Sequence, residues 1–214
     1  MLIKERMSRH PITVTPDTSL FDALRIIRDE KIRRLPVLDS AGKLVGIISE
    51  KDLLYASPSP ATTLSIYEMN YLISKIKIKE LMTTRVITVE DDCPLEEAAR
   101  IMVDNNISSL PVMSGGTLVG MVTESDLFKI FIELLGARQK GLRVTILMTE
   151  GVGVLAKLTS GLAALEADIL ALGTFSGDEP NNREIVFKVQ GVEKEAVEAL
   201  VQELHAEIVD IRSI

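Results

Sequence analysis

The chain has few of the residues on which many catalytic and structural sites depend. Its 214 residues include one cysteine, Cys93, two histidines, His10 and His205, and no tryptophan. A single cysteine excludes an internal disulfide, and two isolated histidines supply neither a histidine-rich metal site nor a histidine-based triad. Because Cys93 directly precedes Pro94 at an expected helix start, we assign it a structural role. We therefore expect no catalytic residues and no metal site.

Long apolar runs and an excess of positive charge are also absent. No apolar run approaches the ~20 residues of a membrane span, and Met1–Arg6 lacks the apolar core of a signal peptide. The net charge of −7 argues against a general nucleic-acid surface. At 46% apolar and 26% charged residues, the chain can bury a substantial core in one or two domains. We expect a cytoplasmic protein that binds neither membranes nor nucleic acid.

The chain contains an internal repeat. Four early stretches align with four later ones: Ile3-Lys4-Glu5 with Ile78-Lys79-Glu80, Met7 with Met82, Ile12-Thr13-Val14 with Ile87-Thr88-Val89, and Leu35-Pro36-Val37 with Leu110-Pro111-Val112. The second copy loses one residue around Ser114-Gly115-Gly116, a turn where a deletion costs little. Two copies of one small supersecondary unit are therefore predicted.

Both copies close with a glycine, two apolar residues, a hydroxyl residue, two polar residues and an aspartate, over residues 46–52 and 120–126. The apolar residues predict a buried strand, and Ser49 or Thr123 marks the start of a helix. Such a corner offers an anion backbone N–H groups, a hydroxyl and close approach at the glycine, while Asp52 or Asp126 can accept hydrogen bonds from a ribose diol. The same spacing also fits a capping box, which satisfies only the helix's own amides. Both interpretations stay open.

The order of motifs in each copy resembles the CBS (cystathionine-β-synthase) domain, and two copies in tandem resemble a CBS pair, or Bateman module. The resemblance implies CBS domains over residues 1–56 and 78–136, separated by a linker and an inserted helix over 57–77. It also implies an adenine nucleotide (AMP, ADP or ATP) as regulatory ligand, with no catalytic cofactor. The implied nucleotide-binding residues are Thr13, Arg33, Arg34, Pro36, Gly46, Ser49, Asp52, Thr88, Ser109, Pro111, Gly120, Thr123 and Asp126.

The copies differ in charge before the Leu-Pro-Val strand. The first has Arg33-Arg34, and the second has Ser108-Ser109. Adjacent arginines at the mouth of a strand are usual on a solvated surface, but the CBS resemblance implies that they reach nucleotide phosphates, a task that suits guanidinium. We expect the two sites to be inequivalent, with Arg33 and Arg34 assisting Ser49 and Asp52.

The segment between the copies is an addition to the repeated unit. Residues 57–63 read as a linker, and an amphipathic helix is predicted over 64–75 with Thr63 as its cap. The apolar side chains of this helix are Leu64, Tyr67, Tyr71 and Leu72. In the interpretation that we favour they cover an exposed flank of the module, and in the alternative they contact a partner subunit. Similar inserts occur in proteins that resemble the acetoin-utilisation AcuB family, which implies a role in acetoin metabolism.

Residues 142–214 predict the order β-α-β-β-α-β, the ferredoxin-like arrangement. A strand, a glycine turn and Gly153-Val154-Leu155 at a helix start resemble an ACT domain. The resemblance implies sheet pairing between chains and an effector near Glu150, Gly151, Gly153 and Leu155. Because this loop lacks the proline common in amino-acid-binding ACT domains, a dimerisation domain without a ligand stays open.

We therefore expect an α/β (α+β) protein, a tandem CBS pair followed by an ACT-like domain at 142–214. It would act as a non-catalytic, homodimeric sensor that regulates an unidentified enzyme. The alternative is an enzyme of purine-nucleotide metabolism resembling IMP dehydrogenase, but no barrel and no nucleophile with an adjacent base is found. A third possibility, a transcription factor that uses the CBS pair as its sensing half, finds no support, because no helix-turn-helix is predicted in the rest of the chain. The predicted site residues address ribose and phosphate alone, so AMP, ATP and S-adenosylmethionine fit them equally.

Overall fold

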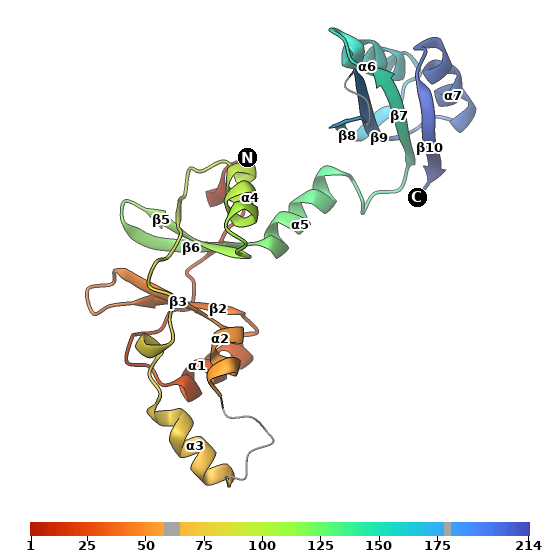
Figure 1. Cartoon of the computed structure of the whole chain (residues 1–214). Helices are drawn as coiled ribbons and strands as arrows, with labels where there is room; N and C mark the ends of the chain where they lie inside the picture. Colours follow the sequence, from red (N-terminus) through yellow and green to blue (C-terminus); the bar gives the residue numbers. More distant parts are fainter. Residues whose placement is uncertain (58–64, 178–180) are drawn as a thin grey trace. The chain divides into compact units, whose positions relative to one another are not determined.

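The computed structural model describes residues 1–57, 65–177 and 181–214. It divides into two compact units, Met1–Leu127 and Phe128–Ile214, which are described separately (Figure 1). Within the described residues, no helix is long and apolar enough to cross a membrane.

The first copy of the repeat forms a two-stranded sheet with helices around it (Figure 1). Its elements are η1 (Ile3–Glu5), β1 (Ser8–Arg9), α1 (Leu20–Glu30), β2 (Arg34–Leu38), β3 (Leu44–Ser49) and α2 (Glu50–Ala56), followed by the inserted α3 (Ile66–Lys75). Helix α1 begins after Ser19, whose Oγ accepts a hydrogen bond from the Asp22 N–H, and ends at Lys31 in the left-handed conformation. A capped start and a left-handed stop explain why the helix begins and ends at these residues.

The second copy repeats this order and contributes most of a four-stranded sheet, β1-β6-β5-β4. Its elements are η2 (Ile78–Glu80), β4 (Val89–Glu90), α4 (Leu95–Asp104), β5 (Ser109–Ser114), β6 (Thr117–Thr123) and α5 (Glu124–Leu134). Helix α4 starts after Pro94 with Glu96 and Glu97 in its first turn, where the helix dipole favours negative charge. Helices therefore start after both repeated hydroxyl residues, Ser49 and Thr123, as predicted.

Each copy gives its opening segment to the core of the other copy. Ile3 is fully buried among residues of the second copy, and Ile78 is fully buried among residues of the first. The backbone follows the same exchange, because Ile3 N–H donates to the Cys93 carbonyl and Ile78 N–H donates to the Thr18 carbonyl, both at 3.0 Å. Neither hydrophobic core is thus complete without the other copy.

The repeated glycines make room for this exchange. A Cβ on Gly46 would lie 2.5 Å from the Met82 sulfur, and one on Gly120 would lie 2.5 Å from the Met7 sulfur. Each methionine comes from the opening segment of the other copy. Glycine at these positions therefore has a packing role that its place in the repeat did not reveal.

Two expectations for the first copy are corrected. Ile12-Thr13-Val14, which its apolar and β-branched residues predict to be a strand, forms only one parallel bridge, between Val14 and Val37, because the prolines at 11 and 16 donate no backbone hydrogen bond on either side. Helix α3 is capped by Ser65, whereas Thr63 lies outside the described residues. Tyr67 and Tyr71 are 88% and 63% exposed, so these two side chains do not cover a flank. Leu64 and the side chain of Leu72, to which the same expectation applied, lie outside what the structure describes.

The second unit has the predicted βαββαβ order. Its elements are β7 (Leu142–Thr149), α6 (Val154–Ala164), β8 (Asp168–Ser176), β9 (Asn182–Gln190), α7 (Lys194–Glu203) and β10 (Glu207–Ser213). The strands form an antiparallel sheet in the order β10-β7-β9-β8. Alternate residues of the strands, among them Ile146 and Phe187, pack against Leu158 of α6 and Val201 of α7. Both helices therefore cover the same face of the sheet.

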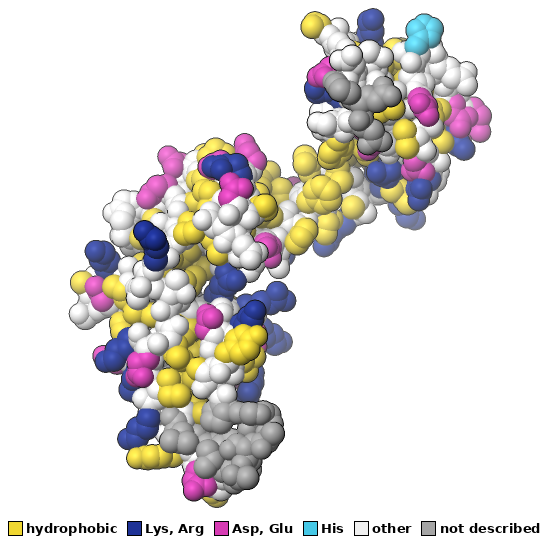
Figure 2. All heavy atoms as spheres, in the orientation of Figure 1, with side chains coloured by type: hydrophobic (Ala, Val, Ile, Leu, Met, Phe, Trp, Pro, Cys, Tyr) yellow, Lys and Arg dark blue, Asp and Glu magenta, His cyan; other side chains and the backbone are white. Residues whose placement is uncertain are grey.

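The segment between α5 and β7 is anchored to the opposite face of this sheet. Lys188 of β9 is 2% exposed, and its Nζ donates to the carbonyl of Gly136 at 3.1 Å and to that of Gln139. Helix α5 keeps apolar side chains on its surface, with Phe128 66%, Phe131 51% and Leu134 63% exposed (Figure 2). Lys188 thus holds the turn that follows α5 by two of its backbone carbonyls.

Candidate functional site

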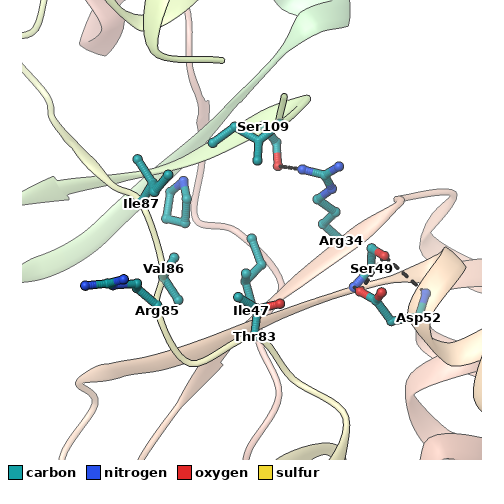
Figure 3. Close-up of a pocket in the computed structure, with 11 residues that line it drawn as sticks. Arg34, Ile47, Ser49, Asp52, Thr83, Arg85, Val86, Ile87 and Ser109 are labelled. Atoms are coloured by element: carbon teal, nitrogen blue, oxygen red, sulfur yellow. Dashed lines mark hydrogen bonds between the residues drawn. The ribbon is translucent and has the colours of Figure 1, made fainter. Parts of the chain in front are cut away.

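Two clefts lie in the first unit, and the reciprocal exchange builds both. The first cleft has a volume of about 260 Å³ and combines Ser49 and Asp52, at the start of α2, with the opening segment of the second copy (Figure 3). The second cleft has a volume of about 360 Å³ and combines Thr123, at the start of α5, with the opening segment of the first copy. Each cleft therefore needs both copies of the repeat.

The apolar walls of the two clefts occupy equivalent positions in the repeat. Ile47, Ile87 and Ile107 line the first cleft, and their counterparts Met121, Ile12 and Ile32 line the second. These side chains come from a strand of one copy and from two segments of the other. The repeat therefore preserves an apolar slot that admits a flat, weakly polar group.

Both aspartates of the repeated corner form capping boxes. Asp52 Oδ2 accepts from the Ser49 hydroxyl at 2.6 Å and from the Ser49 N–H at 3.0 Å, and Asp126 Oδ2 accepts from the same two groups of Thr123 at 2.7 and 3.1 Å. The capping geometry considered from the sequence is therefore present in both copies. Asp52 also lines the first cleft, so its carboxylate serves the helix at the edge of that cleft.

Arg34 lines both clefts. Its Nη1 donates to the Ser109 hydroxyl at 2.8 Å (Figure 3). Its Nη2 donates to the Ser108 hydroxyl at 2.7 Å. Burial lowers the pKa of the guanidinium from its ordinary value, while the nearby charges of Asp52 and Glu124 oppose that change. Ser109 is the repeat counterpart of Arg34, so this contact joins equivalent positions of the two copies.

The other charged groups divide between the clefts. Arg85 lines the first cleft, and Lys31, Arg33 and Glu124 line the second. The grouping expected from the sequence is corrected, because Arg33 lies with Thr123 and not with Ser49. Arg33 precedes the first residue of β2, whereas Arg34 is that first residue and lines both clefts. Lys31, Arg85 and Glu124 were missed, although the position of Arg85 in a segment aligned with the start of the chain was a usable signal.

The predicted nucleotide-binding residues thus fall into three groups. Those of the first cleft are Arg34, Ser49, Asp52, Ser109 and Pro111, and those of the second are Arg33, Arg34, Ser109 and Thr123. The remaining residues are not among those that line either cleft, and they stay predictions: Thr13, Pro36, Gly46, Thr88, Gly120 and Asp126.

A separate hollow of about 410 Å³ lies in the second unit at the start of α6. It brings together all four residues of the predicted effector loop: Glu150, Gly151, Gly153 and Leu155. Gly153 caps α6 with a φ of +83°, a conformation that favours glycine. Arg183 of β9 also lines the hollow and forms an ion pair with Glu150. The acidic group of the loop therefore already has a partner within the chain.

No metal centre is apparent in the part of the chain that the structure describes. Residues 1–57, 65–177 and 181–214 contain no group of three or more histidine, cysteine, aspartate or glutamate side chains placed to hold an ion. The charged groups at the clefts are mainly guanidinium and ammonium groups, which suit anions better than cations.

Two copies of one α/β unit that complete each other's cores, with two clefts lined by residues of both, define the class of this module. A model of the family described as "CBS domain" matches residues 3–59 and 78–133, which are the two copies of the repeat. Because these matches together cover more than half of the sequence, the chain belongs to the CBS domain family.

Curated relatives match somewhat more than half of the chain. A CBS domain-containing protein of Dictyostelium discoideum is 38% identical over 136 residues, which are 63% of this chain and 94% of that protein. Inosine-5'-monophosphate dehydrogenase of Nitrosopumilus maritimus is 33% identical over 122 residues, which are 56% of this chain but 22% of that enzyme. The similarity to the dehydrogenase is therefore confined to a minor part of the enzyme.

Solved structures show the same fold. A protein from Vibrio cholerae assigned to acetoin utilization (AcuB) is 33% identical with a TM-score of 0.53, covering 64% of this chain and 95% of that one. The CBS domain pair of protein MJ0100, in complex with 5'-methylthioadenosine and S-adenosyl-L-methionine, is 34% identical with a TM-score of 0.52, covering 65% and 98%. CBSX2 in complex with AMP is 30% identical with a TM-score of 0.51, covering 64% and 98%.

Proposed function

We propose that the chain is a non-catalytic regulatory protein that binds adenine nucleotides in its two clefts. The observation that carries the proposal is the pairing, in each cleft, of an apolar slot with a hydroxyl residue and basic side chains. The slot suits a purine base, and the polar groups suit ribose and phosphate. Similar CBS pairs, CBSX2 and MJ0100, were solved with AMP and with adenosine-containing sulfur compounds.

The residues of the first cleft divide the nucleotide between them. Ile47, Ile87 and Ile107 enclose the base, Asp52 accepts from the ribose hydroxyls, and Arg34 and Arg85 hold the phosphate. In the second cleft the equivalent apolar residues enclose the base, and Lys31, Arg33 and Arg34 hold the phosphate.

A ligand screen by thermal shift tests this assignment. AMP, ADP, ATP and S-adenosylmethionine are compared with inorganic phosphate and with guanosine monophosphate as matched controls. At least one adenine compound is expected to raise the unfolding temperature well beyond both controls, because the slot and the basic groups act together. Equal shifts with adenine compounds and with phosphate alone would contradict a nucleotide site.

For the second unit we propose an ACT-like regulatory domain that pairs two chains. Support comes from the βαββαβ order, from strands β8 and β10 at the edges of its sheet, and from the exposed apolar side chains of α5. The Glu150–Arg183 ion pair at the predicted effector loop favours the pairing role over effector binding. Light scattering is expected to give the mass of a homodimer at micromolar concentration, and a monomer mass would refute the proposal.

The enzymatic alternative has less support. Only 22% of the matched IMP dehydrogenase corresponds to this chain, so the likeness concerns a minor segment of that enzyme. Assays of the purified protein with AMP, ATP or NAD are expected to give no turnover, and steady product formation would overturn the sensor proposal.

The regulated partner is proposed from likeness alone. The similarity to the acetoin-utilization protein of Vibrio cholerae supports a cytoplasmic regulator of an enzyme of acetoin metabolism. Deleting the encoding gene should then slow growth on acetoin as carbon source and leave growth on glucose unchanged. Equal growth of both strains on acetoin would remove this part of the proposal.

A further inference from the structure

Arg34 holds a position that no other basic residue shares within the described part of the chain. Arg85 lines only the first cleft, and Lys31 and Arg33 line only the second, whereas Arg34 lines both. The repeat provides no second arginine for this place, because the counterpart of Arg34 is Ser109. Two equivalent clefts thus have one guanidinium in common.

The contacts of Arg34 keep its charge available to either side. Its two hydrogen bonds go to the neutral hydroxyls of Ser108 and Ser109, which hold the planar group without neutralising it. Two carboxylates interact electrostatically with the guanidinium: Asp52, which lines the first cleft, and Glu124, which lines the second. The guanidinium therefore lies in the electrostatic field of both sites.

We propose that Arg34 is a phosphate ligand shared by the two clefts, so that an anionic nucleotide in one cleft weakens binding of a second in the other. The inference rests on the proposed nucleotide function and adds to it a coupling between the sites. A phosphate bound to the guanidinium in one cleft offsets the positive charge that the other cleft depends on. The effect is reciprocal, because a binding free energy that couples two sites is the same in both directions.

The clefts differ in how much they depend on the shared group. The second cleft has Lys31 and Arg33 of its own, whereas the first has only Arg85 besides Arg34. The first phosphate-bearing ligand therefore enters the second cleft, and the cleft with Ser49 and Asp52 fills later. The sequence had led us to expect that Arg33 and Arg34 both assist Ser49 and Asp52, which would have favoured the first cleft.

Titration calorimetry on the full chain measures the coupling directly. Ile47→Trp blocks the first cleft and Met121→Trp blocks the second, since these residues are counterparts that each line one cleft. Phenylalanine replaces tryptophan at either position if circular dichroism shows a folding defect. The coupling factor is the overall association constant for binding two ligands, divided by the product of the association constants of the two single clefts. A factor of one means that the clefts are independent, and a factor below one means that each ligand weakens binding of the other.

For AMP the factor is expected to be on the order of one tenth or lower. For 5'-methylthioadenosine, which has no phosphate, it is expected to be one. Arg34→Gln should bring the AMP factor close to one, and Arg33→Gln, the matched control in one cleft, should weaken AMP without changing the factor. One AMP per wild-type chain but two per Arg34→Gln chain is the extreme form of the expected result.

Three outcomes are decisive against the proposal. An AMP factor of one in the wild-type chain, or a factor that Arg34→Gln leaves unchanged, would show independent clefts while the nucleotide function stands. A factor below one that is equally low for 5'-methylthioadenosine would assign the coupling to shape and not to Arg34. No binding of AMP, ATP or 5'-methylthioadenosine at all would instead overturn the nucleotide function itself.

Discussion

The two clefts have the same frame and different charges. Their apolar walls come from equivalent positions, and both adjoin a capping box with the same bonding pattern. The first cleft has Asp52 and Arg85 at its edge, while the second has Glu124, Lys31 and Arg33. The frame is constrained because it is also the packing that joins the copies, whereas the polar positions around it are free to differ. The two clefts therefore share their frame and Arg34 but differ in the other charged residues that line them.

The largest effect is expected where the two copies exchange their opening segments. Ile78→Ala should destabilise the first unit by about 2–5 kcal/mol, the usual range for truncating a fully buried isoleucine. Urea unfolding measures the loss, and hydrogen exchange locates it. Protection should fall in α1 and β2 of the first copy, although Ile78 belongs to the second.

Ile3→Ala is the mirror test, with loss of protection in α4 and β5, and Ile12→Ala is the control because Ile12 is 36% exposed. A loss confined to the copy that carries the substitution would contradict the reciprocal cores.

Ligand binding should separate the two units of the chain. AMP at one hundred times its dissociation constant is expected to stabilise the unit that binds it by about 2.7 kcal/mol per site. At roughly 2–4 °C per kcal/mol, the transition should rise by several degrees. Scanning calorimetry should show the shift in the first unit, with no change for an isolated segment 142–214 if it folds. A rise in the unfolding temperature of the isolated segment on adding AMP would place the nucleotide site in the second unit and contradict its assignment to the first.

The capping boxes give a smaller and more symmetrical effect. Asp52→Ala and Asp126→Ala should each lower the stability of the unliganded chain by about 1 kcal/mol, because each removes the same cap. Asp52→Ala should weaken AMP more than Asp126→Ala does, since Asp52 lines a cleft. Thermal unfolding with and without AMP measures both quantities.

Asp22→Ala is the matched control, because Asp22 bonds to Ser19 at the start of α1 and lines neither cleft. If this variant lost AMP affinity as Asp52→Ala does, the effect of Asp52 would belong to helix capping alone.

The smallest effect concerns an exposed ion pair between the copies. Lys79 Nζ lies 2.8 Å from Asp17 Oδ1, and this hydrogen bond lowers the pKa of Asp17 below its ordinary 3.8. Because the pKa of Asp17 is lower in the folded chain than in the unfolded chain, the ion pair stabilises the fold at any pH above the unfolded-state pKa. This stabilisation is lost as the pH falls through the folded-state pKa. Asp17→Asn should cause a slight loss of stability near neutral pH that disappears in strong acid. A loss that persists unchanged in strong acid would assign it to something other than charge.

Local features of this fold could be read from the sequence, because neighbouring residues determine them. Pro94 precedes α4, and the hydroxyl residues 49 and 123 precede helices, as predicted. The order of the second unit followed from its apolar spacing. In each case the interactions that decide the structure lie within a few residues.

Features that depend on contacts distant in the sequence could not be read in this way. Nothing local to Ile3 indicates that it belongs to the core of the second copy, and nothing local to Gly46 indicates Met82 above it. The same holds for Arg33, whose cleft is decided by which opening segment lies across from it. Only the structure could therefore show which charged residues line which cleft.

Equilibrium dialysis of the full chain against labelled AMP tests whether the two clefts bind adenine nucleotides. We expect saturable binding of up to two AMP per chain, reduced to at most one by either Ile47→Trp or Met121→Trp and abolished by both together. Failure to bind AMP saturably, or binding that survives the double substitution in a folded chain, would contradict it.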